Sequence, residues 1–333
     1  MSSKKISILL ATHNKSRFLD LTLAAYTLQT YKDFELVIVD DGSTDNTSEI
    51  INKYKDELDI RYLPQNRDGI SKARSKTLEN TNGEYVIITD DDRIPCKNFV
   101  MEHKKRLDAE EKIVVIGKEC LILSHFTHDT RYAFKDEFKI YNKYPELLDC
   151  EEKVMFTADD IKNDFDAVID NFYLSDYTES CLLNMVERYG EDLDGFYLAW
   201  SKAFGGNMSF DMRYLEEPLL YDHNYKGYGI EDIDFSYQLF RQGYRFVFSS
   251  QAINYHQEHP RGKMENRDMF RNFKYFCEKY PNVDVSLMKM DWDGIIPLEI
   301  ANDFYRVLVE HKGELEEGLK KELISNNYRQ FIK

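Results

Sequence analysis

Residues 85–92 read Tyr-Val-Ile-Ile-Thr-Asp-Asp-Asp, an apolar run that ends abruptly in three acids. A continuous apolar run of this length is typical of a strand that is buried on both faces. Similar runs stand at residues 6–11 and 34–39, and amphipathic helical segments separate the runs. Because strands that alternate with helices form parallel, doubly wound sheets, the first third of the chain predicts an α/β fold.

Acidic side chains follow two of these strands, at the edge of the sheet where ligands bind in doubly wound folds. Asp40 and Asp41 follow one strand, and Asp90, Asp91 and Asp92 follow another. A carboxylate of the first pair can accept hydrogen bonds from a base or a ribose hydroxyl. The three successive acids repel one another, so a divalent cation such as Mg²⁺ or Mn²⁺ would stabilise them. The alternatives are ordinary turns in which the acids cap the helices that follow.

Two further motifs stand in the second half of the chain. Gly205 and Gly206 allow a close approach of the backbone, such as a sugar hydroxyl requires, or simply a turn into a strand at residues 208–210. Glu231 and Asp232 begin a predicted helix, where the helix dipole favours acids in any case. A carboxylate at this position can also act as a general base toward an acceptor hydroxyl.

A histidine follows the last predicted strand. Residues 245–249 predict that strand, and His256 lies just beyond it. A lone histidine is more often a packed side chain than a ligand, so this position by itself leaves both interpretations open. The segment from about residue 120 to 197 is less regular and predicts helices and loops over one edge of the sheet.

The composition excludes some classes of protein. A net charge of −16 over 333 residues argues against a nucleic-acid partner, which normally requires a basic face. The five cysteines are scattered with no CxxC pair, which predicts reduced thiols rather than a zinc knuckle or a disulfide framework. No apolar stretch approaches the roughly 20 residues of a transmembrane helix, and the first apolar run is too short for a signal peptide. We therefore expect a cytoplasmic protein without a transmembrane segment.

Three segments of the first half carry a resemblance to a known family. Residues 7–14, 35–45 and 83–92 resemble, in sequence and spacing, the nucleotide-binding half of family 2 glycosyltransferases. The resemblance implies a GT-A fold, which is α/β and Rossmann-like with a doubly wound mixed sheet, and a UDP-sugar donor. It also implies that Asp90 and Asp92 form a DxD motif in which Asp92 is a direct metal ligand.

The second half resembles the sugar-binding half of bacterial chondroitin polymerase modules and galactosyltransferases. Gly206, residues 231–235 and residues 256–258 occur in the same order and spacing. This resemblance implies that His256 is an additional metal ligand, and that the acids at 231 and 232 bind the sugar and the acceptor. Residues 260–268 are similar to a polymerase loop in which basic residues could cover the diphosphate.

Two positions depart from the pattern of the family. Ser75 stands where asparagine is usual, and His259 stands where proline is more usual. Taken together, the two resemblances imply the following donor-binding residues: Thr12, Asp40, Asp41, Arg74, Asp90, Asp91 and Gly206.

The predicted activity is transfer of a GalNAc, Gal or Glc type of sugar from a UDP-sugar to a hydroxyl of a glycan, lipid-linked or protein acceptor. Asp232, with Glu231 beside it, would deprotonate that hydroxyl. Mn²⁺ or Mg²⁺ held by Asp92 and His256 would offset charge on the departing UDP, with inversion at the anomeric carbon. Two alternatives stay open: a retaining enzyme in which Glu231 and Asp232 only hold donor hydroxyls, and a non-catalytic protein that binds sugar nucleotides.

The predicted organisation has three parts. Residues 1–117 form the nucleotide-binding half, residues 118–266 form the acceptor- and sugar-binding half, and residues 267–333 form a helical extension. The extension is amphipathic, so it would pack on the catalytic domain or on a second subunit of a homo-oligomer, and the alternative is that it docks an acceptor carrier.

Overall fold

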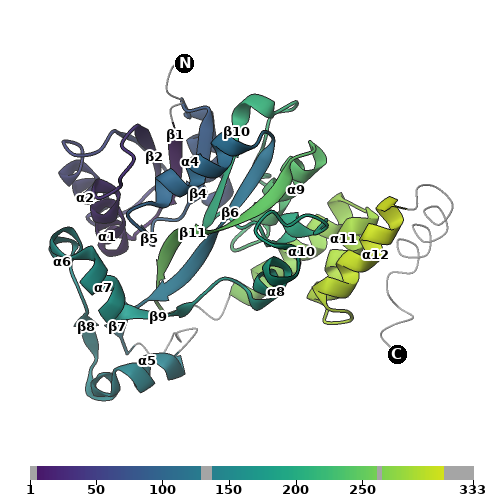
Figure 1. Ribbon diagram of the computed structural model, residues 1–333. Helices are drawn as coiled ribbons and strands as arrows, with labels where there is room; N and C mark the ends of the chain where they lie inside the picture. Colours follow the sequence, from purple (N-terminus) through teal and green to yellow (C-terminus); the bar gives the residue numbers. More distant parts are fainter. Residues whose placement is uncertain (1–5, 129–136, 261–264, 311–333) are drawn as a thin grey trace.

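A mixed sheet at the centre of the molecule carries helices on both faces (Figure 1). The computed structural model describes residues 6–128, 137–260 and 265–310. Within these ranges nine strands form one sheet in the order β3-β2-β1-β4-β10-β6-β11-β5, and β9 pairs with β6 off this path. The predicted α/β class with a mixed sheet is confirmed.

The N-terminal part is the parallel half of the sheet, because β1 to β4 pair in parallel. Ile8 and its alternate neighbours on β1 pack in one core with α1, whereas Leu9 and Val37 belong to the core on the opposite face. Both faces of these strands are therefore buried, as their continuous apolar sequence predicts. The elements are β1 Ile6–Thr12, α1 Ser16–Thr27, β2 Phe34–Asp41, α2 Thr47–Lys53, β3 Ile60–Gln65, α3 Ile70–Glu79 and β4 Tyr85–Thr89.

Strand β10, Asn207–Asp211, makes the sheet mixed, because it runs antiparallel to both β4 and β6. Beyond it, β6 (Ile113–Ile122) pairs in parallel with β11 (Arg245–Gln257), and β11 pairs antiparallel with the short β5 (Arg93–Pro95). Helix α4, Phe99–Ala109, connects β5 to β6. The chain thus returns from its second half to complete the sheet that its first half begins.

The strand predicted at residues 245–249 is longer than expected. An irregularity in the pairing with β6 falls between Ser249 and Ile253, after which β11 continues to Gln257. The sequence prediction ended the strand where this irregularity interrupts the apolar pattern. His256 therefore lies within β11 rather than beyond a strand.

The described residues between β6 and β9 form a small projection from one end of the sheet, below it in Figure 1. Strands β7 and β8 form a two-stranded sheet there, and the buried side chains of Leu123, Phe126, Ile140 and Leu147 form a separate small core. This part consists of helices and short strands, in line with the irregular sequence. Its elements are β7 His125–Thr127, α5 Glu137–Lys143, η1 Pro145–Asp149, β8 Glu152–Val154, α6 Ala158–Asn163, α7 Phe165–Phe172 and β9 Tyr173–Asp176.

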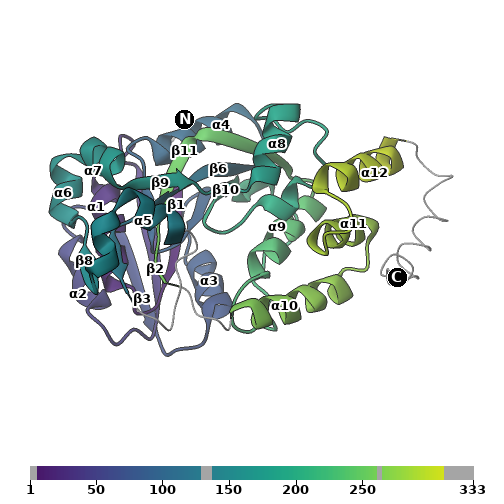
Figure 2. The same cartoon turned by 90° about the horizontal axis from the view of Figure 1, so that it is seen from below.

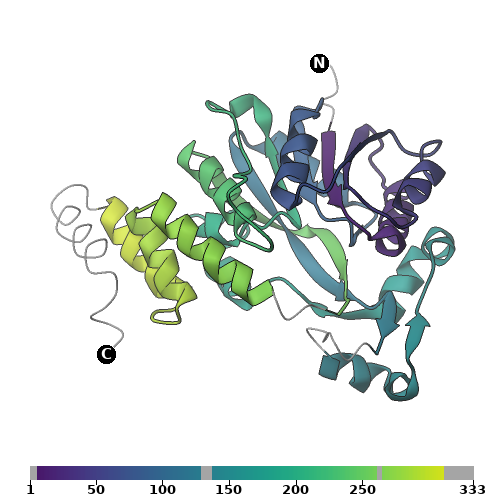
Figure 3. The ribbon, with the colours of Figure 1, turned by 180° about the vertical axis from the view of Figure 1, so that it is seen from behind.

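Helices α11 and α12 gather at the end of the molecule opposite that projection, as the view from behind shows (Figure 3). Trp200, Phe276 and Val285 join this region to the larger core. In the described ranges no helix is long and apolar enough to cross a membrane. The remaining elements are α8 Ser180–Tyr189, η2 Ala199–Lys202, η3 Met212–Tyr214, α9 Glu231–Arg241, α10 Glu265–Lys279, α11 Val283–Trp292 and α12 Leu298–Glu310.

The predicted three-part division stays a prediction. β6 runs across the proposed boundary at residue 117, and α10 begins two residues before the proposed extension. Residues 311–333, which form the rest of that extension, lie outside the described residues.

Candidate active site

A cavity of about 650 Å³ lies at the carboxyl ends of β1, β2 and β4. The start of α3, the segment before α9 and the end of β11 complete its walls. Most of the predicted site residues line it: Thr12, Asp41, Arg74, Asp90, Asp91, Asp92, Glu231 and His256. Three predicted site residues are not among the residues that line the cavity: Asp40, Gly206 and Asp232. Each lies beside a lining residue, which is Asp41, Arg93 and Glu231, respectively.

Asp41 fastens the loop before α3 to the end of β2. Its carboxylate accepts hydrogen bonds from the backbone N–H groups of Asp68 and Gly69, at 2.8 and 2.9 Å, and from Gln65 Nε2 at 2.8 Å. Burial opposes ionisation, but these donors outweigh it and lower the pKa of Asp41. Asp40 binds a different set of groups, since it accepts hydrogen bonds from the turn after β2 and from a tyrosine of β3.

Arg74 of α3 joins three carboxylates that come from distant parts of the chain. Its guanidinium donates to Asp90 Oδ1 at 2.9 Å, to Glu231 Oε1 at 3.0 Å and to Asp232 Oδ1. Burial would lower the pKa of Arg74, but the three acids raise it well above its ordinary value. Burial and the adjacent Asp232 raise the pKa of Glu231 to about 7. The other oxygen of Glu231, Oε2, is buried without a hydrogen-bond partner among the described residues.

Arg93 and Glu119 form a second buried ion pair, which the sequence analysis did not identify. Arg93 Nη1 lies 3.3 Å from Glu119 Oε2, and its Nε lies 3.7 Å from Asp90 Oδ2 and 3.9 Å from Asp92 Oδ1. Arg93 could have been noticed, because a cation directly after three acids can neutralise them. Glu119 stands in β6 without any motif around it, so the sequence offers no signal for it.

The two glycines before β10 make room for charged side chains. A Cβ at Gly205 would lie 2.6 Å from Asp232 Oδ1, and a Cβ at Gly206 would lie 2.7 Å from Glu119 Oε1 and 2.8 Å from Arg93 Nη2. Neither glycine has a positive φ, so space rather than backbone conformation requires them. Both close approaches involve the charged groups around the cavity.

Backbone strain marks the start of α9. Ile230, directly before Glu231, has φ 78° and ψ −23°, which is left-handed backbone. A β-branched residue in this region costs about 1–3 kcal/mol, so surrounding contacts must hold it there. Ile230 is buried in the larger core, and its conformation turns the first residues of α9 toward Arg74.

Asp92 and two histidines form a compact group of possible metal ligands. His256 Nε2 lies 3.7 Å from Asp92 Oδ1, and His259 Nε2 lies 3.4 Å from Asp92 Oδ2. One possible ligand atom from each of the three residues lies within 4.8 Å of the others. His256 reaches Asp92 because it is paired in the sheet with Arg93, the residue that follows Asp92. One carboxylate and two imidazoles are a donor set that fits a divalent cation.

Asp91 and Lys15 lie beside the group formed by Asp92, His256 and His259. Burial and the charge of Asp92 raise the pKa of Asp91 to about 7. The ammonium of Lys15 lies 3.1 Å from Asp92 Oδ2 and 3.0 Å from His259 Nε2. Neither Lys15 nor His259 belongs to the predicted site, and His259 stands out in the sequence only as a departure from the family pattern.

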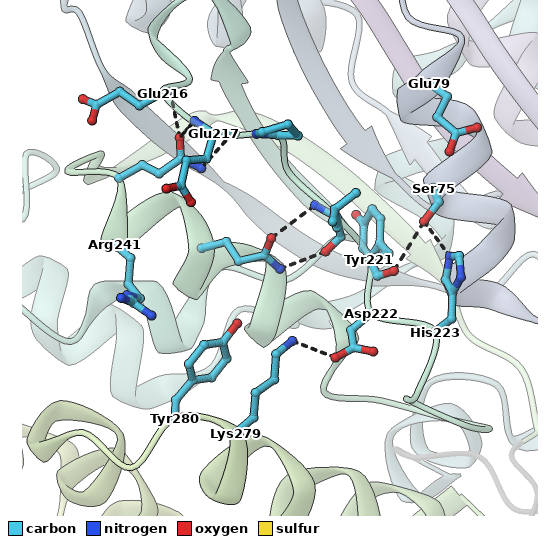
Figure 4. A pocket seen from close by; sticks show the side chains of 14 residues that line it. Ser75, Glu79, Glu216, Glu217, Tyr221, Asp222, His223, Arg241, Lys279 and Tyr280 are labelled. Carbon is cyan, nitrogen blue, oxygen red and sulfur yellow. Dashed lines mark hydrogen bonds and ion pairs between the residues drawn. The ribbon is translucent and has the colours of Figure 1, made fainter.

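A second cavity of about 980 Å³ lies next to the first, between α3, the segment before α9, α9 itself and the end of α10 (Figure 4). Ser75 lines this second cavity, and its Oγ lies 3.1 Å from His223 Nε2. His223 also lines the first cavity, so the two cavities share this side chain. Figure 2 shows α3 and α10 on the same side of the sheet, where the two cavities lie. Ser75, which stands where the family usually has asparagine, therefore lines the second cavity and not the first.

One predicted feature cannot be placed. The loop at residues 260–268, whose basic residues could cover a diphosphate, falls partly on residues 261–264, which lie outside the described residues.

Comparison with known proteins identifies relatives over the whole chain. Residues 7–161 match the family described as Glycosyl transferase family 2. An uncharacterized glycosyltransferase of Bacillus subtilis, YfnE, is 25% identical over 98% of this chain and 83% of its own length. The chondroitin synthase of Pasteurella multocida is 29% identical over 88% of this chain but only 29% of its own length. This chain thus corresponds to less than a third of that relative.

Solved structures are similar over nearly the whole chain. Residues 1–349 of Staphylococcus aureus TarS, solved in complex with UDP, give a TM-score of 0.53 at 15% identity, covering 99% of this chain and 72% of that one. The mannosyltransferase PcManGT of Pyrobaculum calidifontis, solved with GDP-Man and Mn²⁺, gives 0.50 at 15% identity, covering 99% and 81%. At these identities the similarity establishes the fold. The protein has the fold of GT-A glycosyltransferases, and its residues 7–161 match the family 2 glycosyltransferases, which together with its glycosyltransferase relatives supports a glycosyltransferase enzyme.

Proposed function

We propose that the protein transfers a hexose of the GalNAc, Gal or Glc type from a UDP-sugar to an acceptor hydroxyl, with the help of a divalent cation and with inversion. The observation that carries the proposal is the convergence of Asp90, Asp92, Glu231 and His256 on one cavity. The chondroitin synthase relatives and the UDP complex of TarS support a UDP-linked donor.

We propose that the nucleoside occupies the part of the cavity at the ends of β1 and β2. Thr12 and Asp41 line this part, and Asp41 is the fixed acceptor for the loop that closes it. Asp40 would act through the turn after β2, whose backbone it holds. The diphosphate would then lie toward Asp90, where Arg74 can offset its negative charge.

The cation would be held by Asp92 and His256, and the Mn²⁺ complex of PcManGT supports this type of site. A divalent cation supplies charge stabilisation for the departing diphosphate when it is bound. The protein's own contribution is to fix the backbone of Asp92 against β11, since the carbonyl of Asp92 accepts a hydrogen bond from the N–H of Gln257 at 3.0 Å.

Asp232 is the proposed general base. Its carboxylate is held by Arg74 and has space beside it because residue 205 is glycine. Asp232 would accept the proton of the acceptor hydroxyl as the oxygen attacks the anomeric carbon from the face opposite UDP. Glu231, which lines the donor cavity and has one buried oxygen without a hydrogen-bond partner among the described residues, would accept a hydrogen bond from a sugar hydroxyl.

We propose that the acceptor enters through the second cavity. Tyr221 lines this cavity, and its ring lies 5.9 Å from the guanidinium of Arg74, which holds Asp232. Polar side chains such as Asp222 and His223 also line it, which suits a hydroxyl-rich acceptor (Figure 4).

A panel of UDP-sugars tests the proposal directly. We expect Mn²⁺-dependent hydrolysis or transfer with UDP-GalNAc, UDP-Gal or UDP-Glc, and no activity in EDTA. NMR analysis of the anomeric configuration of the product separates the two mechanisms. A product with the donor's configuration would establish retention and assign Glu231 and Asp232 to donor binding. Full activity in EDTA with metal-free protein would refute the cation dependence.

A further inference from the structure

We infer that His259 is a third protein ligand of the cation site, so that the site is built from two histidines and one carboxylate. The inference rests on the proposed cation dependence and goes beyond it. It assigns to this chain a site that selects transition-metal ions over Mg²⁺ and that binds them before the nucleotide arrives.

The two imidazoles lie next to different oxygens of the same carboxylate. His256 Nε2 faces Oδ1 of Asp92 and His259 Nε2 faces Oδ2. The two rings are nearly perpendicular, with an interplanar angle of 85° and centroids 5.7 Å apart. A cation placed between these atoms would therefore meet three ligands that come from different directions.

The hydrogen bonds of His259 determine which of its nitrogens is available. Its Nδ1 lies 3.1 Å from the backbone carbonyl of Pro260. A carbonyl oxygen can only accept, so Nδ1 carries the proton and the lone pair of Nε2 is left to accept a hydrogen bond or to bind an ion. This arrangement, in which one ring nitrogen donates to a backbone carbonyl and the other faces the ion, is the usual one for metal-binding histidines.

The backbone between the two histidines is fixed on both sides. The N–H of Gln257 donates to the carbonyl of Asp92 at 3.0 Å, and the N–H of Glu258 donates to the carbonyl of Ile122 at 2.8 Å. His259 directly follows these two residues and is thus held near Asp92 by the end of β11. Its ring also packs on Phe18, with centroids 5.6 Å apart.

The donor set decides the preferred ion. Mg²⁺ favours oxygen ligands and retains its waters, whereas imidazole nitrogen binds later transition metals more strongly. A site with two nitrogens should therefore prefer Co²⁺ to Mn²⁺ and both to Mg²⁺. Three protein ligands should also hold the ion without the diphosphate.

Lys15 competes for the same atoms. Its ammonium lies 3.1 Å from Asp92 Oδ2 and 3.0 Å from His259 Nε2, so it and a divalent cation cannot both occupy this position. The Lys15 side chain is 27% exposed and can turn away into the cavity. Replacing Lys15 by methionine should therefore strengthen binding of the cation to the protein alone.

The experiment measures Co²⁺ binding to the full-length protein without nucleotide, by calorimetry and by the visible absorption of the bound ion. We expect His259→Phe, which keeps an aromatic ring against Phe18, to weaken Co²⁺ binding by at least about tenfold and to change the spectrum. His259→Gln should behave similarly. His13→Phe is the matched control, because His13 lines the same cavity but lies outside the ligand group, and it should leave Co²⁺ binding unchanged.

The outcomes separate this inference from the proposed function. If the wild type and both His259 variants bind Co²⁺ equally while His256→Phe does not, the inference fails and the proposed cation site stands. If the wild type binds no Co²⁺ and transfers sugar in EDTA, the proposed cation dependence fails. Melting temperatures of the variants show whether any loss is due to unfolding. A weaker affinity for Co²⁺ in Lys15→Met would refute the role of Lys15 as a competitor.

Discussion

The two cavities that meet at His223 are built in different ways. Around the donor cavity the charged side chains are buried and share partners: the Arg74 side chain is 10% exposed and contacts three carboxylates. The second cavity has a half-buried pair, Lys279 with Asp222. At its rim, however, Glu216, 70% exposed, pairs with Lys112. A buried network fails as a unit when one member is removed, whereas exposed pairs contribute little each. Substitutions should therefore have large effects in the first cavity and small, separable effects in the second.

The largest effect is expected for Arg74→Met. The substitution leaves three carboxylates around the donor cavity without their shared cation, which should destabilise the protein by about 3–5 kcal/mol and abolish transfer. Arg188→Met is the matched control, because Arg188 pairs with Asp303 at an exposed site, and it should cost about 1 kcal/mol or less. Urea denaturation of both variants measures the difference. Equal losses in the two variants would remove the distinction between the buried network and exposed pairs.

Asp232→Asn should lower kcat by roughly 10²–10⁴-fold, because an amide cannot accept the acceptor's proton. Binding of UDP should persist, since Arg74 still meets Asp90 and Glu231. Titration calorimetry with UDP and steady-state kinetics measure the two quantities. Glu231→Gln serves as the comparison and should raise the KM for the donor more than it lowers kcat. A normal kcat in Asp232→Asn would transfer the role of base to another residue.

The buried His103 makes the stability of the protein depend on pH. Its buried ring lies 2.9 Å from Asn207 Oδ1 and 2.8 Å from Ser209 Oγ, below the two glycines. Burial lowers the pKa of His103 from 6.5 to about 4. As the pH falls, His103 therefore binds a proton in the unfolded chain before it does so in the folded protein. His103 leaves the free energy of unfolding unchanged above about pH 6.5 and lowers it progressively toward pH 4, by up to about 3 kcal/mol.

Urea denaturation of wild type and His103→Gln at several pH values measures this contribution. Glutamine can still bind Asn207 but does not titrate, so the variant should lose less stability between about pH 7 and 5 than the wild type does. Parallel curves for the two proteins would show that other groups cause the pH dependence.

The smallest effect is expected in the second cavity. Arg241 is exposed and lines it, so Arg241→Ala should raise the KM for the acceptor by roughly fivefold, the loss of about one hydrogen bond. Hydrolysis of the UDP-sugar should stay unchanged. Lys274→Ala on the exposed face of α10 is the control and should change neither quantity. A loss of donor hydrolysis in Arg241→Ala would mean that the two cavities are not separable.

The part of the site nearest to the N-terminus could be predicted from the sequence. Apolar runs identified β1, β2 and β4, and the acids that follow β2 and β4 placed Asp41, Asp90 and Asp92 at one edge of the sheet, because the signal lies within a few consecutive residues. The roles of these residues in donor and metal binding stay predictions. Glu231 and His256, named from a resemblance in order and spacing, also line the cavity.

The rest depends on contacts between distant residues. The pairing of β5 with β11 brings His256 next to Arg93. No local sequence pattern predicts a pairing between two strands that are so far apart in the sequence. Glu119 and Lys15 join the site for the same reason. His259 was described only as a departure from the family pattern, since its neighbours in sequence do not reveal its proximity to Asp92. The second cavity is likewise assembled from short contributions of four separate segments.

Strand β11 lies between β6 and β5 in the sheet but follows both of them in the sequence. The sheet can therefore be completed only late in the synthesis of the protein. As the chain leaves the ribosome, β1 to β4 can pair with one another soon after they appear, since all four lie within the first 90 residues and are adjacent in the sheet order β3-β2-β1-β4. Asp90 and Asp92 are then already in place, but β10 and β11 are still to be made. A growing chain that has not yet reached His256 therefore has the acids without the histidines, and it exposes the edge of β6 that β11 will later cover. The nascent chain consequently passes through a long interval with an unpaired sheet edge, in which chaperones that bind such edges would find their target.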